Sequence, residues 1–195
     1  LNFSDAYFAD TLQYAQTGNL PSCVDYSPSG SYMAIVNKVS NTLQIFDSNT
    51  LTQIGNDVLT GSAPICVSWS NTSTQLAVVN SEDNTVKVYN FNGSGTPTLS
   101  VSTSTGTSPS CVTWSPYGNY IAVTNLGSNN FQIFKSDTLA QIGSDATTDS
   151  NPSSVSWAPG DRLIAVTNSI SNTLQIFSFD GASTPTQVAS ESTDF

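Results

Sequence analysis

One block of sequence is written four times along the 195-residue chain. The copies begin at Pro21, Pro64, Pro109 and Pro152, so the steps between them are 43, 45 and 43 residues. They read PSCVDYSPSGSYMAIVN, PICVSWSNTSTQLAVVN, PSCVTWSPYGNYIAVTN and PSSVSWAPGDRLIAVTN. A shorter block follows each copy, as SNTLQIF, DNTVKVY, SNNFQIF and again SNTLQIF. Because the register is kept through the whole unit, the chain is built by copying one structural unit.

Each unit predicts four short β-strands. CVSWS alternates, so that Val67 and Trp69 share one face. A turn with Pro or Gly follows in three of the four units, then the continuous apolar run QLAVVN, then TVKVY and, after a looser stretch, PTLSVST. Only 9% of the residues are charged, a composition that suits strands and turns better than exposed helices. A four-stranded repeat of this length is the signature of a propeller blade, so we predict an all-β β-propeller of antiparallel blades.

The predicted blades cover residues 21–63, 64–108, 109–151 and 152–195. Residues 1–20, with a strand at Thr11 to Gln16, are expected to form the outer strand of a preceding or ring-closing blade. Four blades can close by themselves, belong to a longer propeller, or meet a second chain in an eight-bladed ring. An open half-ring would expose two apolar faces, more than a soluble monomer normally carries.

A pair of blades is the larger copied object. Units one and three share TLTQIG and TLAQIG, whereas units two and four share NGSGTPT and DGASTPT. This alternation favours a ring completed by further blades or by a second chain.

The blocks VTWSPYGNYIAV from Val112 and DNTVKVYN from Asp83 resemble the WD-repeat family. The segment VTNLGSNNFQIF is also similar to bacterial lactonase-type propellers. The family's recurrent His is missing, and its Trp-Asp pair is replaced by Phe46-Asp47, Tyr89-Asn90, Phe134-Lys135 and Phe177-Ser178. The resemblance implies a propeller that binds protein partners through its loops.

Charge and residue usage exclude several functions. The net charge is -10, with 14 acids against four bases, so no basic surface for nucleic acid or for an anionic membrane can form. No apolar run is long enough to span a bilayer, so membrane insertion is not expected. The chain has no His, which removes Ser-His and Cys-His nucleophiles and the commonest metal ligand. We therefore predict no catalytic residue, no cofactor and no metal, and a protein that is not an enzyme.

Three positions of the repeat carry the same kind of side chain in most or all units and are candidate sites. Cys23, Cys66 and Cys111 share one position, where Ser154 stands in the fourth unit. A thiol cluster or metal site is the functional reading. The favoured reading is a small buried residue, because equivalent positions of neighbouring blades are normally too far apart for a disulfide. The aromatic column Tyr26, Trp69, Trp114 and Trp157 could stack on ligands but is predicted to be structural core.

Asn ends the second strand of every unit. Turn capping is the favoured reading, and a ring of amides that binds a ligand is the alternative. The members of this possible face or turn ring are Asn37, Asn80, Asn125 and Asn168. The acid pairs Glu82-Asp83 and Asp145/Asp149 lie in predicted loops and are interpreted as solvated rather than catalytic.

The sequence leaves three functional hypotheses. The preferred one is a non-catalytic scaffold for protein–protein interaction. The second is a structural subunit that assembles with copies of itself through open blade faces, into a ring or a filament. The third is a lactonase-like enzyme whose active residues lie outside this segment. The low charge and the Ser, Thr and Asn content favour an extracellular or cell-surface location.

Overall fold

The computed structural model describes residues 14–193, and its strands form four antiparallel sheets of four strands each. Blade 1 consists of β1 (Pro21–Tyr26), β2 (Tyr32–Asn37), β3 (Thr42–Asp47) and β4 (Gln53–Leu59). Blade 2 consists of β5 (Pro64–Trp69), β6 (Gln75–Asn80), β7 (Thr85–Asn90) and β8 (Thr98–Ser104). Blade 3 consists of β9 (Pro109–Trp114), β10 (Tyr120–Asn125), β11 (Asn130–Lys135) and β12 (Ala146–Thr147). Blade 4 consists of β13 (Pro152–Trp157), β14 (Leu163–Asn168), β15 (Thr173–Ser178) and β16 (Thr186–Ser192).

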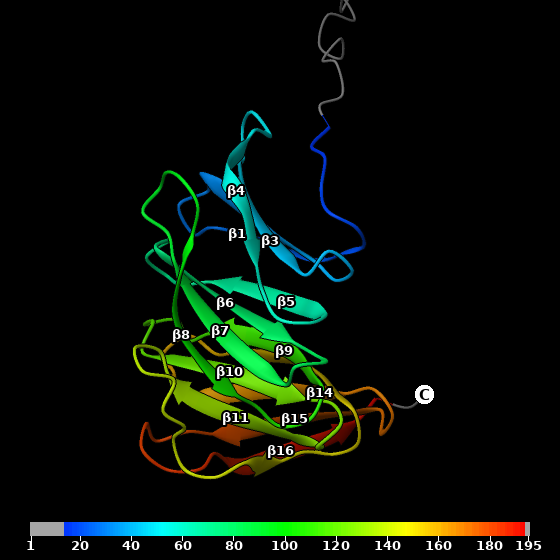
Figure 1. Cartoon of the computed structure of the whole chain (residues 1–195). Helices are drawn as coiled ribbons and strands as arrows, with labels where there is room; N and C mark the ends of the chain where they lie inside the picture. Colours follow the sequence, from blue (N-terminus) through cyan, green and yellow to red (C-terminus); the bar gives the residue numbers. More distant parts are fainter. Residues whose placement is uncertain (1–13, 194–195) are drawn as a thin grey trace, which may run out of the picture.

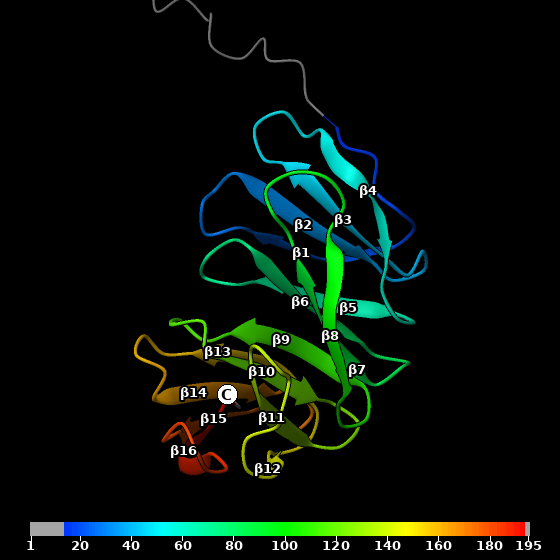
Figure 2. The same ribbon diagram turned by 60° about the vertical axis from the view of Figure 1, so that its left-hand side comes forward.

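The four blades confirm the predicted propeller. They stack in chain order, from blade 1 at one end to blade 4 at the other, in both views (Figures 1 and 2). The first strand of each blade is the inner one, and β1 packs on β5, β5 on β9 and β9 on β13. The strand expected at Thr11 to Gln16 falls mostly outside the described residues, and no strand is present at its described end, Tyr14 to Gln16. The blade limits themselves stay a prediction.

The repeated SNT block has a conformational cause. Asn41, between β2 and β3, has a φ of 57°, a left-handed turn conformation that Asn tolerates better than most residues. Its carbonyl accepts from Thr60 N at 2.9 Å and its Oδ1 accepts from Ala63 N at 2.8 Å. The turn of blade 1 therefore holds the loop that enters blade 2. The same left-handed φ recurs in the other three blades, at Asn84, Asn129 and Asn172.

The core lies between the blades. Val67 and Trp69 of β5 are 3% and 4% exposed and pack on Ala34 and Ile45 of blade 1. The indole nitrogen of Trp69 donates to the carbonyl of Asp25 at 3.2 Å. Trp114 repeats both the packing and the hydrogen bond in the next interface, whereas Trp157 repeats the packing alone, since its buried indole nitrogen has no hydrogen-bond partner. The aromatic column therefore points back toward the preceding blade.

Tyr26 is the exception in that column and corrects the sequence prediction. It was predicted to be core, but it is 59% exposed, and its neighbour Val24 is 57% exposed. The cause is its place in the stack, because its face of blade 1 has no blade against it within the described residues. The opposite end of the stack is also open, where Leu163 of blade 4 is 43% exposed and a shallow apolar hollow includes Ala165 and Ile176.

Hydrogen bonds between outer loops join the blades in pairs, and each of these bonds is called an outer-loop clip. Asn56 N of blade 1 donates to Thr96 Oγ1 of blade 2 at 2.9 Å. Ser144 N of blade 3 donates in the same way to Thr184 Oγ1 of blade 4. Gly55 permits the approach, since its φ is 74° and a Cβ there would lie 2.5 Å from the Gly95 carbonyl carbon. In the part of the chain that the structure describes, no such bond joins the outer loops of blades 2 and 3.

Candidate functional site

The inner strands form the wall where propellers most often build their sites, and their side chains alternate. Val67 and Trp69 point back to blade 1, whereas the intervening residues point forward to the next blade. Cys23 Sγ lies 3.8 Å from the carbonyl oxygen of Val67, and Cys66 Sγ lies 3.7 Å from that of Val112. The thiols therefore occupy successive blade interfaces at the inner edge of the sheets.

The three thiols form a row, closer together than the sequence analysis expected. The Cys23 and Cys66 sulfurs are 3.9 Å apart, and those of Cys66 and Cys111 are 3.8 Å apart. All three are free and half-buried. Among residues 14–193, no group of three or more His, Cys, Asp or Glu side chains converges in a way that could hold a metal ion. A row, unlike a tetrahedral cluster, brings sulfurs together only in neighbouring pairs.

The middle thiol sets the acidity of the outer two. A hydrogen bond with Cys66 lowers the pKa of Cys111 to about 6, against the desolvation that opposes it. The equivalent bond lowers the pKa of Cys23 to about 7. The pKa of Cys66 is raised, because its two thiol neighbours and its burial all favour its neutral form. The row therefore has a protonated centre, whose single proton can stabilise a thiolate at one end or at the other.

Asp25 is the one charged residue on the four inner strands. Its Oδ2 accepts from the backbone N of Trp69 at 2.8 Å, and burial raises its pKa despite that bond. The other blades carry Ser68, Thr113 and Ser156 in its place. No second carboxylate or histidine faces it from the described inner strands, so it has no partner for acid–base work.

The Asn column, which ends the second strand of each blade, is buried. Its members Asn37, Asn80, Asn125 and Asn168 are 0–2% exposed. Asn80 accepts from Gly61 N at 2.9 Å and donates to Thr85 Oγ1 at 3.1 Å, so it joins the incoming loop to the hairpin beneath it. The amides act here as internal cross-links, and ligand binding by a ring of them stays a prediction.

A glutamine column beside the Asn residues was not identified from the sequence. Gln132 Oε1 accepts from Asn125 Nδ2 at 3.1 Å and from Gly106 N at 2.9 Å. Its Nε2 donates to Gln141 Oε1 and to Asp145 Oδ1, both at 3.0 Å. Gln44 and Gln175 repeat its contact with the Asn of their own blades. The signal was present in the sequence, because this Gln is the fifth letter of SNTLQIF.

The acid pairs also make structural contacts. Asp83 Oδ2 accepts from Ser62 N at 2.8 Å, and Asp149 Oδ2 accepts from Thr173 Oγ1 at 2.7 Å. Asp145 accepts from two glutamine side chains and from Asn130 Nδ2. Asp83, Asp145 and Asp149 are therefore occupied in joining loops to hairpins.

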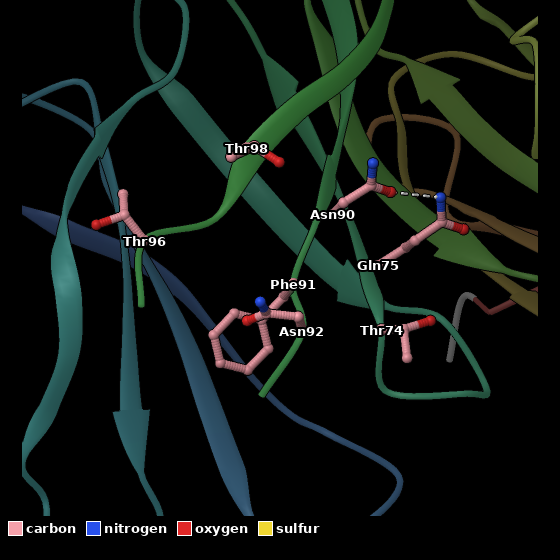
Figure 3. A pocket seen from close by; sticks show the side chains of 7 residues that line it. All are labelled: Thr74, Gln75, Asn90, Phe91, Asn92, Thr96 and Thr98. Carbon is pink, nitrogen blue, oxygen red and sulfur yellow. Dashed lines mark hydrogen bonds between the residues drawn. The ribbon is translucent and has the colours of Figure 1, made fainter. Parts of the chain in front are cut away.

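One cavity lies beside blade 2 and is lined by uncharged side chains. It measures about 420 Å³ and is lined by Thr74, Gln75, Asn90, Phe91, Asn92, Thr96 and Thr98 (Figure 3). Gln75 Nε2 donates to Asn90 Oδ1 at 2.9 Å across its wall. Amide and hydroxyl groups of this kind can hydrogen-bond a neutral ligand but cannot supply a general base. A second cavity of about 200 Å³ lies between blades 3 and 4 and is lined in part by Asp161, Arg162 and Asp180.

The fold is shared with propellers of known structure. A putative 6-phosphogluconolactonase of Bacteroides uniformis has a TM-score of 0.81 and 16% identity, over 95% of this chain and 61% of its own. The periplasmic gluconolactonase of Pseudomonas aeruginosa has a TM-score of 0.74 and 19% identity, over 86% and 52%. The hydrazine synthase of Kuenenia stuttgartiensis has a TM-score of 0.72 and 17% identity, over 93% and 53%. This chain thus spans between about half and three fifths of each.

These structural neighbours correct the prediction about enzymatic activity and limit what can be said of the resemblance to WD-repeat proteins. The prediction that the chain is not an enzyme is contradicted, because the structural neighbours include proteins named as lactonases. That prediction rested on residues missing from four blades, but a site at the channel of a propeller is shared by all the blades around it. The comparisons support the propeller architecture and do not single out the WD-repeat family.

In the described residues, no helix combines the length and the apolar character needed to cross a membrane.

Two further comparisons concern the sequence alone. No curated protein matches the chain. The sequence model of the family described as eukaryotic translation initiation factor eIF2A matches residues 52–191, nearly three quarters of the chain. The chain therefore belongs to the eukaryotic translation initiation factor eIF2A family.

Proposed function

We propose that this chain is the four-blade part of a lactonase-like propeller enzyme, and that further blades supply the residues acting on the substrate. The observation that carries the proposal is the likeness to lactonases over 52–61% of their length, together with an open apolar face at each end of the stack. Further blades packed on these two faces would complete a ring with a central channel.

The chemistry explains why the four blades are not sufficient. Opening a lactone needs an activated water and donors that stabilise the oxyanion of the tetrahedral intermediate. The inner strands described here offer one carboxylate, Asp25, and it is held by the backbone of Trp69. The chain has no His, and Arg162 lies between β13 and β14, away from the inner wall residues. The catalytic groups would therefore come from the completing blades.

The charge of the chain favours an uncharged lactone. Its net charge is -10, and its four cations lie singly on different blades, at Lys38, Lys87, Lys135 and Arg162. Lys87 is also engaged, since its Nζ donates to the carbonyl of Thr60 at 3.1 Å. A phosphorylated sugar would meet a repulsive field from these blades, whereas a neutral sugar lactone would not. A location outside the cytoplasm, as in the periplasmic gluconolactonase, accords with this substrate class.

The test compares the native protein with the 195-residue chain. The native protein is purified from its source, its denatured mass is measured, and both samples are assayed with gluconolactone and with 6-phosphogluconolactone. We expect a longer native polypeptide that hydrolyses the neutral lactone faster than the phosphorylated one, and a 195-residue chain at the spontaneous rate. A folded, longer native protein without lactone hydrolysis would overturn the proposal.

A second candidate function is a structural subunit whose copies complete the ring. The specific observation is that the open faces repeat the interface between blades 2 and 3. Ala165 and Ile176 of blade 4 stand where Ala77 and Val88 stand in blade 2, 88 residues earlier. On blade 1, the exposed Val24 stands where Val112 is buried in blade 3. Blade 1 of one copy could thus pack on blade 4 of another as blade 3 packs on blade 2.

Light scattering of the isolated chain tests this second candidate. We expect a particle of two chains, which the Val24→Asp variant reduces to one chain because a carboxylate cannot be buried unpaired at the interface. Val39→Asp is the matched control, since Val39 is 62% exposed in the turn between β2 and β3, away from the open faces. A single-chain particle at every concentration would contradict self-completion and leave the blades of a longer polypeptide.

The family description refers to translation initiation, and the chain's charge bears on one part of such a role. Direct contact with RNA phosphates requires clustered Lys and Arg, which the four separate cations do not provide. Binding of protein partners by the blade loops, expected from the sequence, stays a prediction beside the lactonase proposal.

A further inference from the structure

The thiol row on the inner strands is a cluster that neither the fold nor the proposed function explains. Cys23, Cys66 and Cys111 come from three blades, yet each outer sulfur lies within 4 Å of the middle one. We propose that this row is a site of reversible oxidation, at which a peroxide converts Cys66 and one of its two neighbours to a disulfide.

The geometry permits one disulfide and no more. A disulfide needs a sulfur–sulfur distance near 2.05 Å, so a pair now 3.8 Å apart must close by roughly 2 Å through side-chain rotation and small strand movements. Cys23 and Cys111 lie on opposite sides of Cys66 and contact it rather than one another. Whichever pair forms, Cys66 is a member and the third thiol stays reduced.

A purely structural role accounts for the size of these side chains but not for their chemistry. Ser154 occupies the same position in blade 4, where it is exposed, and its hydroxyl contacts Cys111, so contact within this row does not itself require a thiol. A metal site is disfavoured, because soft metals are held by ligands that converge from several directions and these sulfurs lie in a row. Pairwise oxidation is the reaction that a row of contacting thiols allows.

The oxidation proceeds in two balanced steps. The Cys111 thiolate attacks a peroxide oxygen, so that an S–O bond forms, the O–O bond breaks, and a water leaves after protonation. Sulfur is oxidised to sulfenic acid and the peroxide is reduced. The Cys66 sulfur then attacks the sulfenic sulfur, an S–S bond forms, and the S–O bond breaks. The Cys66 proton leaves with the departing hydroxide as water, and Cys23 can replace Cys111 in both steps.

The acidities of the row suit these roles. The hydrogen bond from Cys66 lowers the pKa of Cys111 to about 6 or that of Cys23 to about 7, and because Cys66 has a single proton to donate, one end of the row at a time is favoured as a thiolate at neutral pH. Cys66 stays protonated and acts as the resolving thiol. All three side chains are half-buried rather than sealed, which leaves room for a reagent as small as hydrogen peroxide.

Hydrogen peroxide and a thiol count on the folded 195-residue chain test the proposal. After treatment, denaturation and alkylation, we expect one reactive thiol in place of three, a mass lower by two hydrogen atoms before alkylation, and full reversal by a dithiol reductant. Peptide mapping should place Cys66 in every intrachain disulfide. Three alkylatable thiols after treatment, or a mapped Cys23–Cys111 bond, would overturn it.

Serine variants supply the matched controls, because serine differs from cysteine only in having oxygen in place of sulfur. Cys66→Ser should form no intrachain disulfide. Cys23→Ser and Cys111→Ser should each still form one disulfide, which consumes both of their remaining thiols. A folded Cys66→Ser that forms a disulfide as fast as the unmodified chain would contradict the proposal. The sulfurs lie inside the four-blade stack, so this result does not depend on lactone hydrolysis or on how the ring is completed.

Discussion

Replacement of Trp114 by alanine is expected to lower the free energy of unfolding by about 3–5 kcal/mol. The Trp114 side chain is 7% exposed and belongs to the cluster between blades 2 and 3. Its indole nitrogen also donates to the carbonyl of Ser68 at 3.0 Å. Alanine would leave a cavity at this interface and would remove that hydrogen bond. Urea unfolding followed by circular dichroism measures the loss.

Tyr26→Ala is the matched control for Trp114→Ala. Tyr26 stands in the same column, 88 residues earlier, but it is 59% exposed on the open face of blade 1. In the isolated single chain its loss should change the free energy of unfolding by no more than about 0.5 kcal/mol. Equal losses from the two variants would show that contact with the preceding blade is not the source of the stability. A large loss from Tyr26→Ala alone would mean that its face is covered in solution.

Replacement of Asn125 by alanine is expected to cost about 1–3 kcal/mol of stability, because it removes two side-chain hydrogen bonds from the interior. Asn125 is fully buried, and its Nδ2 donates to Asn130 Oδ1 at 2.8 Å and to Gln132 Oε1 at 3.1 Å. The same Gln132 oxygen holds the incoming loop through Gly106 N. Proteolysis of that loop and urea unfolding should both report the loss.

Asn119→Ala is the control for the loss of an amide side chain that is not buried. Asn119 is exposed in the turn before β10, and the bond recorded to it, from Ser136 N at 3.0 Å, uses its backbone carbonyl. Its replacement should leave both readouts nearly unchanged. If Asn125→Ala were as mild as Asn119→Ala, the buried amide would not be a cross-link between hairpin and loop.

The repeat made the fold predictable. Period-two alternation around Val67 and Trp69, followed by a continuous apolar run, defines strands whose register cannot slip without exposing the core. Because the pattern recurs four times, an error in one unit would have conflicted with the other three. Element ends were less predictable: β4 has seven residues and begins within TLTQIG, whereas β12 has two residues and begins after TLAQIG has ended. Strand limits of this kind depend on hydrogen-bond geometry near the threshold of assignment.

The candidate site was less predictable, for two physical reasons. The distance between Cys66 and Cys111 depends on how closely the inner strands of neighbouring blades approach, and a linear sequence does not contain that spacing. The role of Gln132 depends on a loop that arrives from the preceding blade. The wrong prediction about enzymatic activity has a related cause, because a property of the whole ring was inferred from residues missing in a part of it.

The outer-loop clips have a consequence for how gene duplication can increase the number of blades. Asn56 and Thr96 join blades 1 and 2, and Ser144 and Thr184 join blades 3 and 4. Each clip needs one partner from an odd-numbered blade and one from an even-numbered blade. Gene duplication of a single blade would place two blades of one kind side by side and leave a clip without its partner. Duplication of the pair preserves every clip, so a ring enlarged by this route gains blades two at a time.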